Sequence, residues 1–227
     1  MTQLLLDLKP AQIPTLDNYV AGINAELVGR LRALAEPGSF DMIYLWGTPG
    51  SGRSHLLAAA ALAATAQRPT LLLNGAAVGA ELNIAPGGLV ILDDVDALSP
   101  AAQVALFRSF NSARLISLSL LLAGPVPPLG LALREDLRTR IGQTLIYEVK
   151  PLTDAEKSAA LARHALLRGM KVDDGLVQYL LRHGRRDLPS LMAVLDGLDH
   201  ASLAQQRPAT LPLLKKVMQM QLETDDK

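Results

Sequence analysis

The chain has 227 residues, of which 49% are hydrophobic, so it is long and apolar enough for one large domain or a medium domain plus a small one. Lys and Arg number 22, as do Asp and Glu, which gives a formal net charge of zero. Domains that grip DNA directly usually carry a basic excess, so we expect a protein or nucleotide partner and no direct sequence-specific DNA binding. The lack of cysteine excludes disulfides and thiolate metal sites.

The N-terminus does not have the pattern of a secretory signal, because residues 1–10 lack a basic start and contain Asp7. The longest apolar run, at residues 56–66, is too short to cross a bilayer. We therefore expect a cytoplasmic protein that has no membrane partner.

Short apolar runs alternate with helical segments through the first two thirds of the chain. The candidate strands are residues 42–46, 70–74, 89–93, 118–123 and 144–149. They are apolar throughout, as expected for parallel strands that are buried on both faces. Helices are predicted over 54–66 and 100–113, the second with Ser99 as N-cap. This alternation predicts an α/β domain with a five-stranded parallel sheet.

A glycine-rich loop joins the first strand to the first of these helices. Its residues are Gly47, Thr48, Pro49, Gly50, Ser51, Gly52, Arg53 and Ser54. Such a loop lets backbone N–H groups and the positive end of the helix surround a phosphate chain, with the Ser54 hydroxyl on Mg²⁺. A glycine-rich turn that binds nothing is disfavoured, because motif, strand and helix agree.

Arg53 stands where this motif usually has lysine. It keeps the positive charge, but its guanidinium is a bulky planar group and not a compact ammonium. We therefore expect binding of a diphosphate but not fast hydrolysis. Asp93 and Asp94 end the third strand. They suit a Walker B role, with Asp93 near Mg²⁺ and Asp94 orienting a water, although strand-end aspartates also cap turns.

Only helical patterns follow Pro151. Thr153 and Glu156 have the spacing of a capping box, and Gly169 stands where a helix would end. Further helices are predicted over 174–183, 187–205 and 210–222. The predicted organisation is a tail of residues 1–13, an α/β subdomain of residues 14–150 and a small all-helical subdomain of residues 151–222.

Three segments resemble the DnaA-type AAA+ family. Residues 47–57, GTPGSGRSHLL, are similar to its nucleotide motif, and residues 15–24, TLDNYVAGIN, to the box that borders its adenine pocket. Residues 136–140, DLRTR, are similar to its box VII, whose last arginine is an arginine finger. The resemblance covers about residues 3–220. It implies an AAA+ P-loop domain with a helical lid, nucleotide contacts from Tyr19 and His55, and a catalytic arginine at Arg140.

Two features favour one branch of that family. The chain ends after the predicted lid, where the initiator carries a helix-turn-helix domain. In addition, Gln3, Leu4, Leu6 and Leu8 are similar to the motif that docks on the sliding clamp, the β subunit of DNA polymerase III. With the arginine in the P-loop, these features resemble the Hda-like regulatory inactivators of DnaA. This implies bound ADP (or ATP) with Mg²⁺, docking on the clamp, and hydrolysis of DnaA-bound ATP promoted in trans.

Several alternatives stay open. The tail could pair with its own domain as an amphipathic strand, and Arg140 could be a surface residue paired with Asp136 or Glu135. Pro125 and Pro189 stand where the family carries its sensor 1 and sensor 2 side chains, so intrinsic ATPase activity is expected to be weak or absent, and nucleotide affinity is in doubt. A non-hydrolysing adaptor with a vestigial site, or a self-sufficient ATPase or helicase loader, are the competing functions. The oligomeric state is open too, since AAA+ domains often associate head to tail.

Overall fold

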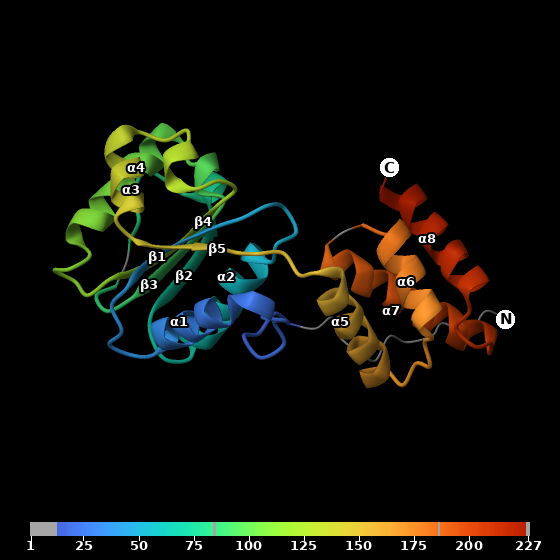
Figure 1. The fold of residues 1–227 in the computed structure, drawn as a ribbon. Helices are drawn as coiled ribbons and strands as arrows, with labels where there is room; N and C mark the ends of the chain where they lie inside the picture. Colours follow the sequence, from blue (N-terminus) through green and yellow to red (C-terminus); the bar gives the residue numbers. More distant parts are fainter. Residues whose placement is uncertain (1–12, 84, 186, 226–227) are drawn as a thin grey trace. The chain divides into compact units, whose positions relative to one another are not determined.

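The structure is a computed structural model that describes residues 13–83, 85–185 and 187–225. These residues form two compact units (Figure 1). An α/β unit spans Ile13–Pro151, and a helical unit begins at Leu152. The clamp-docking residues predicted from the sequence, Gln3, Leu4, Leu6 and Leu8, lie outside the described residues.

The α/β unit is built on a five-stranded parallel sheet, which confirms the predicted fold class. Its strands are β1 (Met42–Trp46), β2 (Thr70–Asn74), β3 (Leu89–Asp93), β4 (Ser119–Gly124) and β5 (Leu145–Glu148). Their order in the sheet is β2-β3-β4-β1-β5, and every pair is parallel. The carboxyl ends of all five strands therefore meet at one edge, where ligands bind in open α/β sheets.

Two helices cover each face of this sheet. The first pair is α1 (Ala25–Ala35) and α2 (Arg53–Thr65), and the second is α3 (Pro100–Ser112) and α4 (Glu135–Gly142). Alternate side chains of the central strands face the two pairs, so that Ile91 packs with the first pair and Leu92 with the second. Ser99 caps α3 as predicted, by accepting a hydrogen bond from the Ala102 N–H.

The prediction that all five strands are buried on both faces is wrong for the two edge strands. β3 and β4 are buried almost throughout. Leu72 of β2 and Ile146 of β5 are each 42% exposed. Among the described residues, each edge strand pairs with one other strand, so its outer side is not covered by a neighbouring strand. An apolar run thus identified the strands without fixing their burial.

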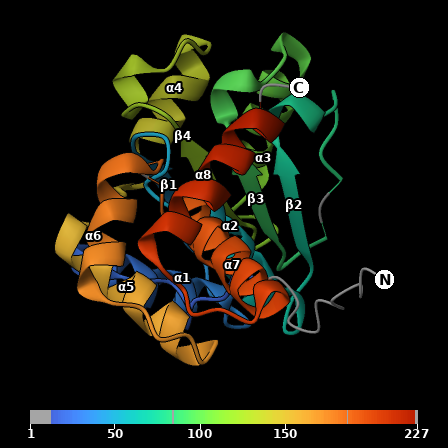
Figure 2. The same cartoon turned by 90° about the vertical axis from the view of Figure 1, so that its right-hand side faces the viewer.

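The helical unit contains α5 (Asp154–Leu167), α6 (Asp174–His183), α7 (Leu188–Gln205) and α8 (Leu211–Asp225). Figure 2 shows these four helices in orange and red. The predicted capping box is present, with Thr153 and Glu156 each bonding the other's backbone N–H. Gly169 ends α5 with a φ of 74°, which few other residues adopt. The helices enclose their own apolar core around Leu161, Leu180 and Leu195.

Short 3-10 turns connect several of these elements. They are η1 (Gly22–Asn24), η2 (Gly75–Ala77), η3 (Val95–Ala97) and η4 (Pro128–Gly130). Among the described residues, no helix has both the length and the apolar character that a membrane span requires.

Arg68 joins the strand ends opposite the ligand-binding edge. It is only 7% exposed, and its guanidinium donates to four backbone carbonyls and two serine hydroxyls. These acceptors belong to Leu34, Ser39, Gly87, Gly88 and Ser119, which come from three separate segments. A planar fork with five N–H donors suits this arrangement, whereas an ammonium offers three.

We predict that Arg68→Lys and Arg68→Ala destabilise the protein. Both leave buried carbonyls without donors, and the alanine variant should lose about 3 kcal/mol or more of unfolding free energy. Urea denaturation measures the loss. The control is Arg114→Ala, an exposed arginine whose loss should change the free energy by no more than about 0.5 kcal/mol. Equal stability of the Arg68 variants and this control would contradict the assigned role.

Candidate nucleotide-binding site

The loop between β1 and α2 has the tight backbone that a phosphate cradle needs. Gly50 and Gly52 have φ angles of 78° and 99°, in the left-handed region that glycine tolerates. A Cβ added to Gly47 would lie 2.7 Å from the Val149 carbonyl oxygen and 2.8 Å from Ser51 Oγ. Gly52 is also the N-cap of α2 and provides no capping side chain. The first N–H groups of α2 therefore point toward the loop without a side-chain acceptor, as at an anion site.

Two side chains of this loop place polar atoms in its interior. Arg53 Nη1 and Ser51 Oγ are buried, and neither has a hydrogen-bond partner among the residues that the structure describes. Buried donors of this kind are rare in folded proteins and call for an explanation. The Arg53 guanidinium lies close enough to Tyr44 to lower the pKa of that phenol, against the larger effect of burial, which raises it. A phosphate in the cradle would satisfy both unpaired atoms.

Ser54 and Asp93 meet at the carboxyl edge of the sheet. The Ser54 hydroxyl donates to Asp93 Oδ2 at 2.6 Å, although the residues are 39 positions apart. Asp93 Oδ1 accepts the Asp94 N–H at 2.9 Å, which fixes the orientation of the carboxylate. One hydroxyl and one carboxylate are a set of hard oxygen ligands that fits Mg²⁺, whose other ligands are usually phosphate oxygens and waters.

Asp94 is turned toward the neighbouring strand. Its backbone is left-handed, with φ of 48°, and its Oδ2 accepts a hydrogen bond from Asn74 Nδ2 at 2.9 Å. Asn74 was not among the residues singled out from the sequence. The signal was available, because Asn74 ends β2 as Asp93 ends β3, and these strands are neighbours in register. Asn74 therefore controls where the Asp94 carboxylate points.

Tyr19 and His55 lie against the same loop. A Cβ at Gly52 would come within 3.0 Å of the Tyr19 ring, and the centroids of the Tyr19 and His55 rings are 5.4 Å apart. His55 Nε2 lies 3.3 Å from the Thr15 carbonyl oxygen. Burial raises the pKa of Tyr19 to about 12, so its hydroxyl is neutral and can both donate and accept. The structure thus gathers Tyr19, residues 47–54 and His55 in one place.

The two positions where the family carries sensors provide no polar side chain. Pro125 follows β4, and the next residue, Val126, accepts a hydrogen bond from the Tyr44 hydroxyl through its carbonyl at 2.6 Å. Pro189 is in the first turn of α7, whose N-cap Asp187 accepts the Ser190 N–H at 2.9 Å. This matches the expectation that a helix begins there.

Arg140 is exposed on α4 and is held by α3. Its Nη2 donates to Asn111 Oδ1 at 3.1 Å, and its guanidinium lies 5.9 Å from the centroid of the Phe107 ring. Asp136, one of the two acidic partners considered from the sequence, pairs with Arg134 at 2.7 Å. Arg140 is therefore an oriented, exposed guanidinium, and its helix α4 lies on the face of the sheet opposite α1 and α2 (Figure 1).

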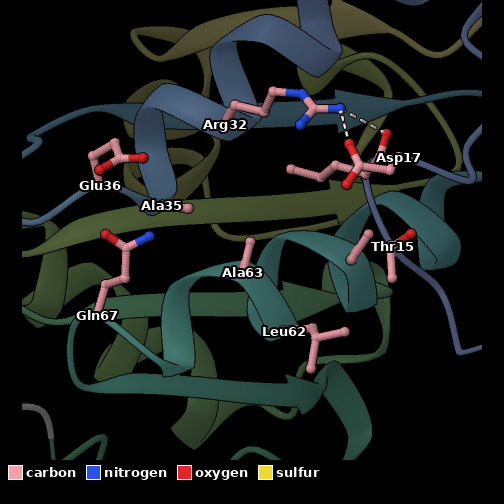
Figure 3. A pocket seen from close by; sticks show the side chains of 10 residues that line it. Thr15, Asp17, Arg32, Ala35, Glu36, Leu62, Ala63 and Gln67 are labelled. Atoms are coloured by element: carbon pink, nitrogen blue, oxygen red, sulfur yellow. Dashed lines mark hydrogen bonds and ion pairs between the residues drawn. The ribbon is translucent and has the colours of Figure 1, made fainter.

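A shallow pocket of about 350 Å³ lies on the outer side of α1 and α2 (Figure 3). Its floor is apolar, with Ala63 and Leu62 from α2, and its rim carries the Asp17–Arg32 ion pair at 2.6 Å. None of residues 47–55 lines it. This pocket is separate from the phosphate loop.

Comparison with known proteins finds the same fold in several solved structures. Domain III of the replication initiator DnaA from Thermotoga maritima is similar with a TM-score of 0.76 at 14% identity, over 93% of this chain and 98% of that one. A mutant of RuvB from Thermotoga maritima has a TM-score of 0.71 at 19% identity, over 94% and 73%. AMPPCP-bound DnaA from Aquifex aeolicus has a TM-score of 0.69 at 21% identity, over 84% and 65%. These likenesses show the fold.

Residues 154–218, in the helical unit, match the family model of the Hda lid domain. The helical unit of this chain is thus similar to the lid of Hda, and the chain has the fold of domain III of DnaA. The matched segment covers α5 to α7 and about half of α8, so the lid corresponds to the four helices that enclose the second apolar core. The lid and the DnaA-like fold together support a role as a regulator of the initiation of DNA replication.

Proposed function

We propose that this protein is an ADP-bound regulator that docks on the sliding clamp and promotes hydrolysis of ATP held by DnaA. The observation that carries the proposal is the coexistence of a phosphate-type loop without sensor side chains and an exposed, oriented Arg140 in one α/β unit. The first feature suits retention of a nucleotide. The second suits catalysis in the site of another ATPase.

The proposal that the protein binds a nucleotide rests on how well the loop fits a phosphate chain. Phosphate oxygens would be bound by the N–H groups at the start of α2, by Arg53 and by Ser51, and Mg²⁺ by Ser54 and Asp93. The adenine would lie on the side of Tyr19 and His55. In DnaA the same kind of fold has been seen with AMPPCP. Bound Mg²⁺ would neutralise phosphate charge.

We predict that ADP with Mg²⁺ binds to the isolated protein and that Arg53→Ala weakens binding about tenfold or more. Hydrogen bonds to charged groups contribute about 1.5–3 kcal/mol, and each 1.4 kcal/mol is a factor of ten. Ser54→Ala should abolish the dependence of affinity on Mg²⁺. Isothermal titration of ADP and ATP measures both effects, with Arg30→Ala, an exposed residue of α1, as the control.

Absence of binding to the wild type at millimolar ADP would make the nucleotide site vestigial and would favour the adaptor function. Fast turnover of ATP by the isolated protein would favour the self-sufficient ATPase. We expect neither, because Pro125 cannot polarise a water or a phosphate and Asp94 is paired with Asn74.

The proposal that the protein promotes hydrolysis of ATP held by DnaA rests on Arg140. A fixed guanidinium stabilises the charge that develops on a transferring phosphoryl group, and one supplied by a partner contributes about 10³–10⁵ in rate. Asn111 and the Phe107 ring restrict the Arg140 side chain before any partner is present. Less conformational entropy is then lost when a partner site closes around it.

We predict that Arg140→Ala lowers stimulated hydrolysis of DnaA-bound ATP by about 10³-fold or more, while ADP binding by this chain is unchanged. Arg140→Lys should also be defective, because an ammonium lacks the fork. The assay follows ATP bound to DnaA in the presence of clamp loaded on DNA, and Arg30→Ala is the control on the opposite face. Normal stimulation by Arg140→Ala would show that the arginine acts elsewhere.

Clamp docking is proposed from the sequence of the N-terminal segment. An extended peptide with a polar anchor and alternate leucines fits a hydrophobic groove. We predict that Leu6→Ala with Leu8→Ala abolishes retention on immobilised clamp and that Leu203→Ala, an exposed leucine of the lid, does not. Retention of the double variant at wild-type level would leave the segment free to pair with its own domain.

A further inference from the structure

Asn24 occupies an unusual place for a residue of its type. It is the N-cap of α1, where asparagine normally bonds an N–H of the first turn, yet its side chain makes no capping bond. The residue is only 5% exposed. Its amide is engaged by a segment 126 positions away. The Asn24 side chain therefore makes hydrogen bonds elsewhere and does not cap α1.

Those hydrogen bonds hold the backbone of Lys150. The Lys150 N–H donates to Asn24 Oδ1 at 3.0 Å, and Asn24 Nδ2 donates to the Lys150 carbonyl at 2.9 Å. Both polar groups of the amide are thus paired with both backbone polar groups of one residue, as a neighbouring strand would pair with it. Lys150 follows β5, and the next residue, Pro151, is the last of the α/β unit. Asn24 therefore fixes the backbone of Lys150 at the point where the chain leaves the sheet for the lid.

The same amide reaches the phosphate loop through Tyr19. Asn24 Nδ2 lies 3.4 Å from the Tyr19 hydroxyl, which accepts its second hydrogen bond. The Tyr19 ring in turn packs over Gly52, where even a Cβ would crowd it at 3.0 Å. A continuous series of contacts thus runs from the phosphate loop through Tyr19 and Asn24 to the backbone of Lys150.

We propose that Asn24 is a positioning residue that couples the phosphate loop to the hinge of the lid. The two hydrogen bonds of Asn24 limit the directions in which the chain can leave Lys150, whether or not nucleotide is present. Nucleotide in the loop then limits the motion of the Tyr19 side chain. Through its hydrogen bond to Tyr19, the Asn24 amide in turn limits the motion of the backbone at Lys150, which is the hinge of the lid. The second half of this inference rests on the proposed nucleotide site, whereas the first half does not.

The test measures the spread of distances between the two units. The native chain has no cysteine, so a spin-label pair can be introduced at the exposed positions Arg114 and Lys216 without background. Double electron–electron resonance is recorded on the full chain without nucleotide and with ADP and Mg²⁺. We expect Asn24→Ala to broaden the distance distribution without nucleotide and to lose any narrowing that ADP causes in the wild type.

Lys150→Ala is the matched control. Asn24 contacts only the backbone of Lys150, so removal of that side chain should leave the distribution as in the wild type. Tyr19→Phe keeps the ring over Gly52 but removes the hydroxyl. It should leave the distribution without nucleotide unchanged and reduce the narrowing by ADP. Asn24→Asp, which has nearly the same shape but no donor for the Lys150 carbonyl, should behave like Asn24→Ala and serves if that variant does not fold.

A thermal melt of each variant separates coupling from simple stability. If Asn24→Ala and Asn24→Asp lower the melting temperature but leave the distance distribution unchanged, the residue is merely structural and the inference is overturned. The same holds if Lys150→Ala broadens the distribution as much as Asn24→Ala. If the wild type does not bind ADP in a parallel titration, the proposed nucleotide site fails. The distance distributions of the wild type and the Asn24 variants without nucleotide still decide whether Asn24 restricts the hinge.

Discussion

The site depends on one constraint of the sheet, the position of β4 between β3 and β1. Because all strands are parallel, the loop after β1 and the carboxylates after β3 open at the same edge, one strand apart. This distance is bridged by the hydrogen bond from Ser54, at the start of α2, to Asp93. The loop, the N-terminus of α2 and the Asp93 carboxylate are thereby fixed relative to one another by the sheet.

The residues that depart from the family pattern share a physical consequence. Pro125 adds no polar group at the end of β4, Pro189 adds none at the start of α7, and Arg53 adds a bulky guanidinium in the interior of the loop. Asp94 is turned away toward Asn74. Each change reduces the ability to activate a water, while the cradle of N–H groups is kept. The arrangement favours holding a nucleotide over hydrolysing it, which agrees with the proposal that Arg140 acts in the site of another ATPase.

The sequence predicts those features of the fold and site that depend on local chemistry. The apolar runs located all five strands, and the spacing of Thr153 and Glu156 gave the start of α5. Features that depend on tertiary pairing could not be read in the same way. Leu72 is apolar but lies on an edge strand, and Arg68 looks like a surface residue until its six acceptors are assembled from distant segments. The partner of Asp94, Asn74, becomes visible only when the strand order is known.

Asn24 illustrates the same limit with a mechanistic consequence. From the sequence it is the last residue of a box that resembles the border of an adenine pocket, and its local preference is to cap α1. The fold overrides that preference, because the Asn24 amide pairs with the N–H and the carbonyl of Lys150 in place of the first turn of α1. A single amide thus satisfies the chain at the point where it departs for the lid and contacts the aromatic residue that lies over the phosphate loop. Since only the backbone of Lys150 is involved, the coupling restricts the amino acid at position 24 far more than the amino acid at position 150. Related chains should therefore keep asparagine at position 24 and vary at position 150.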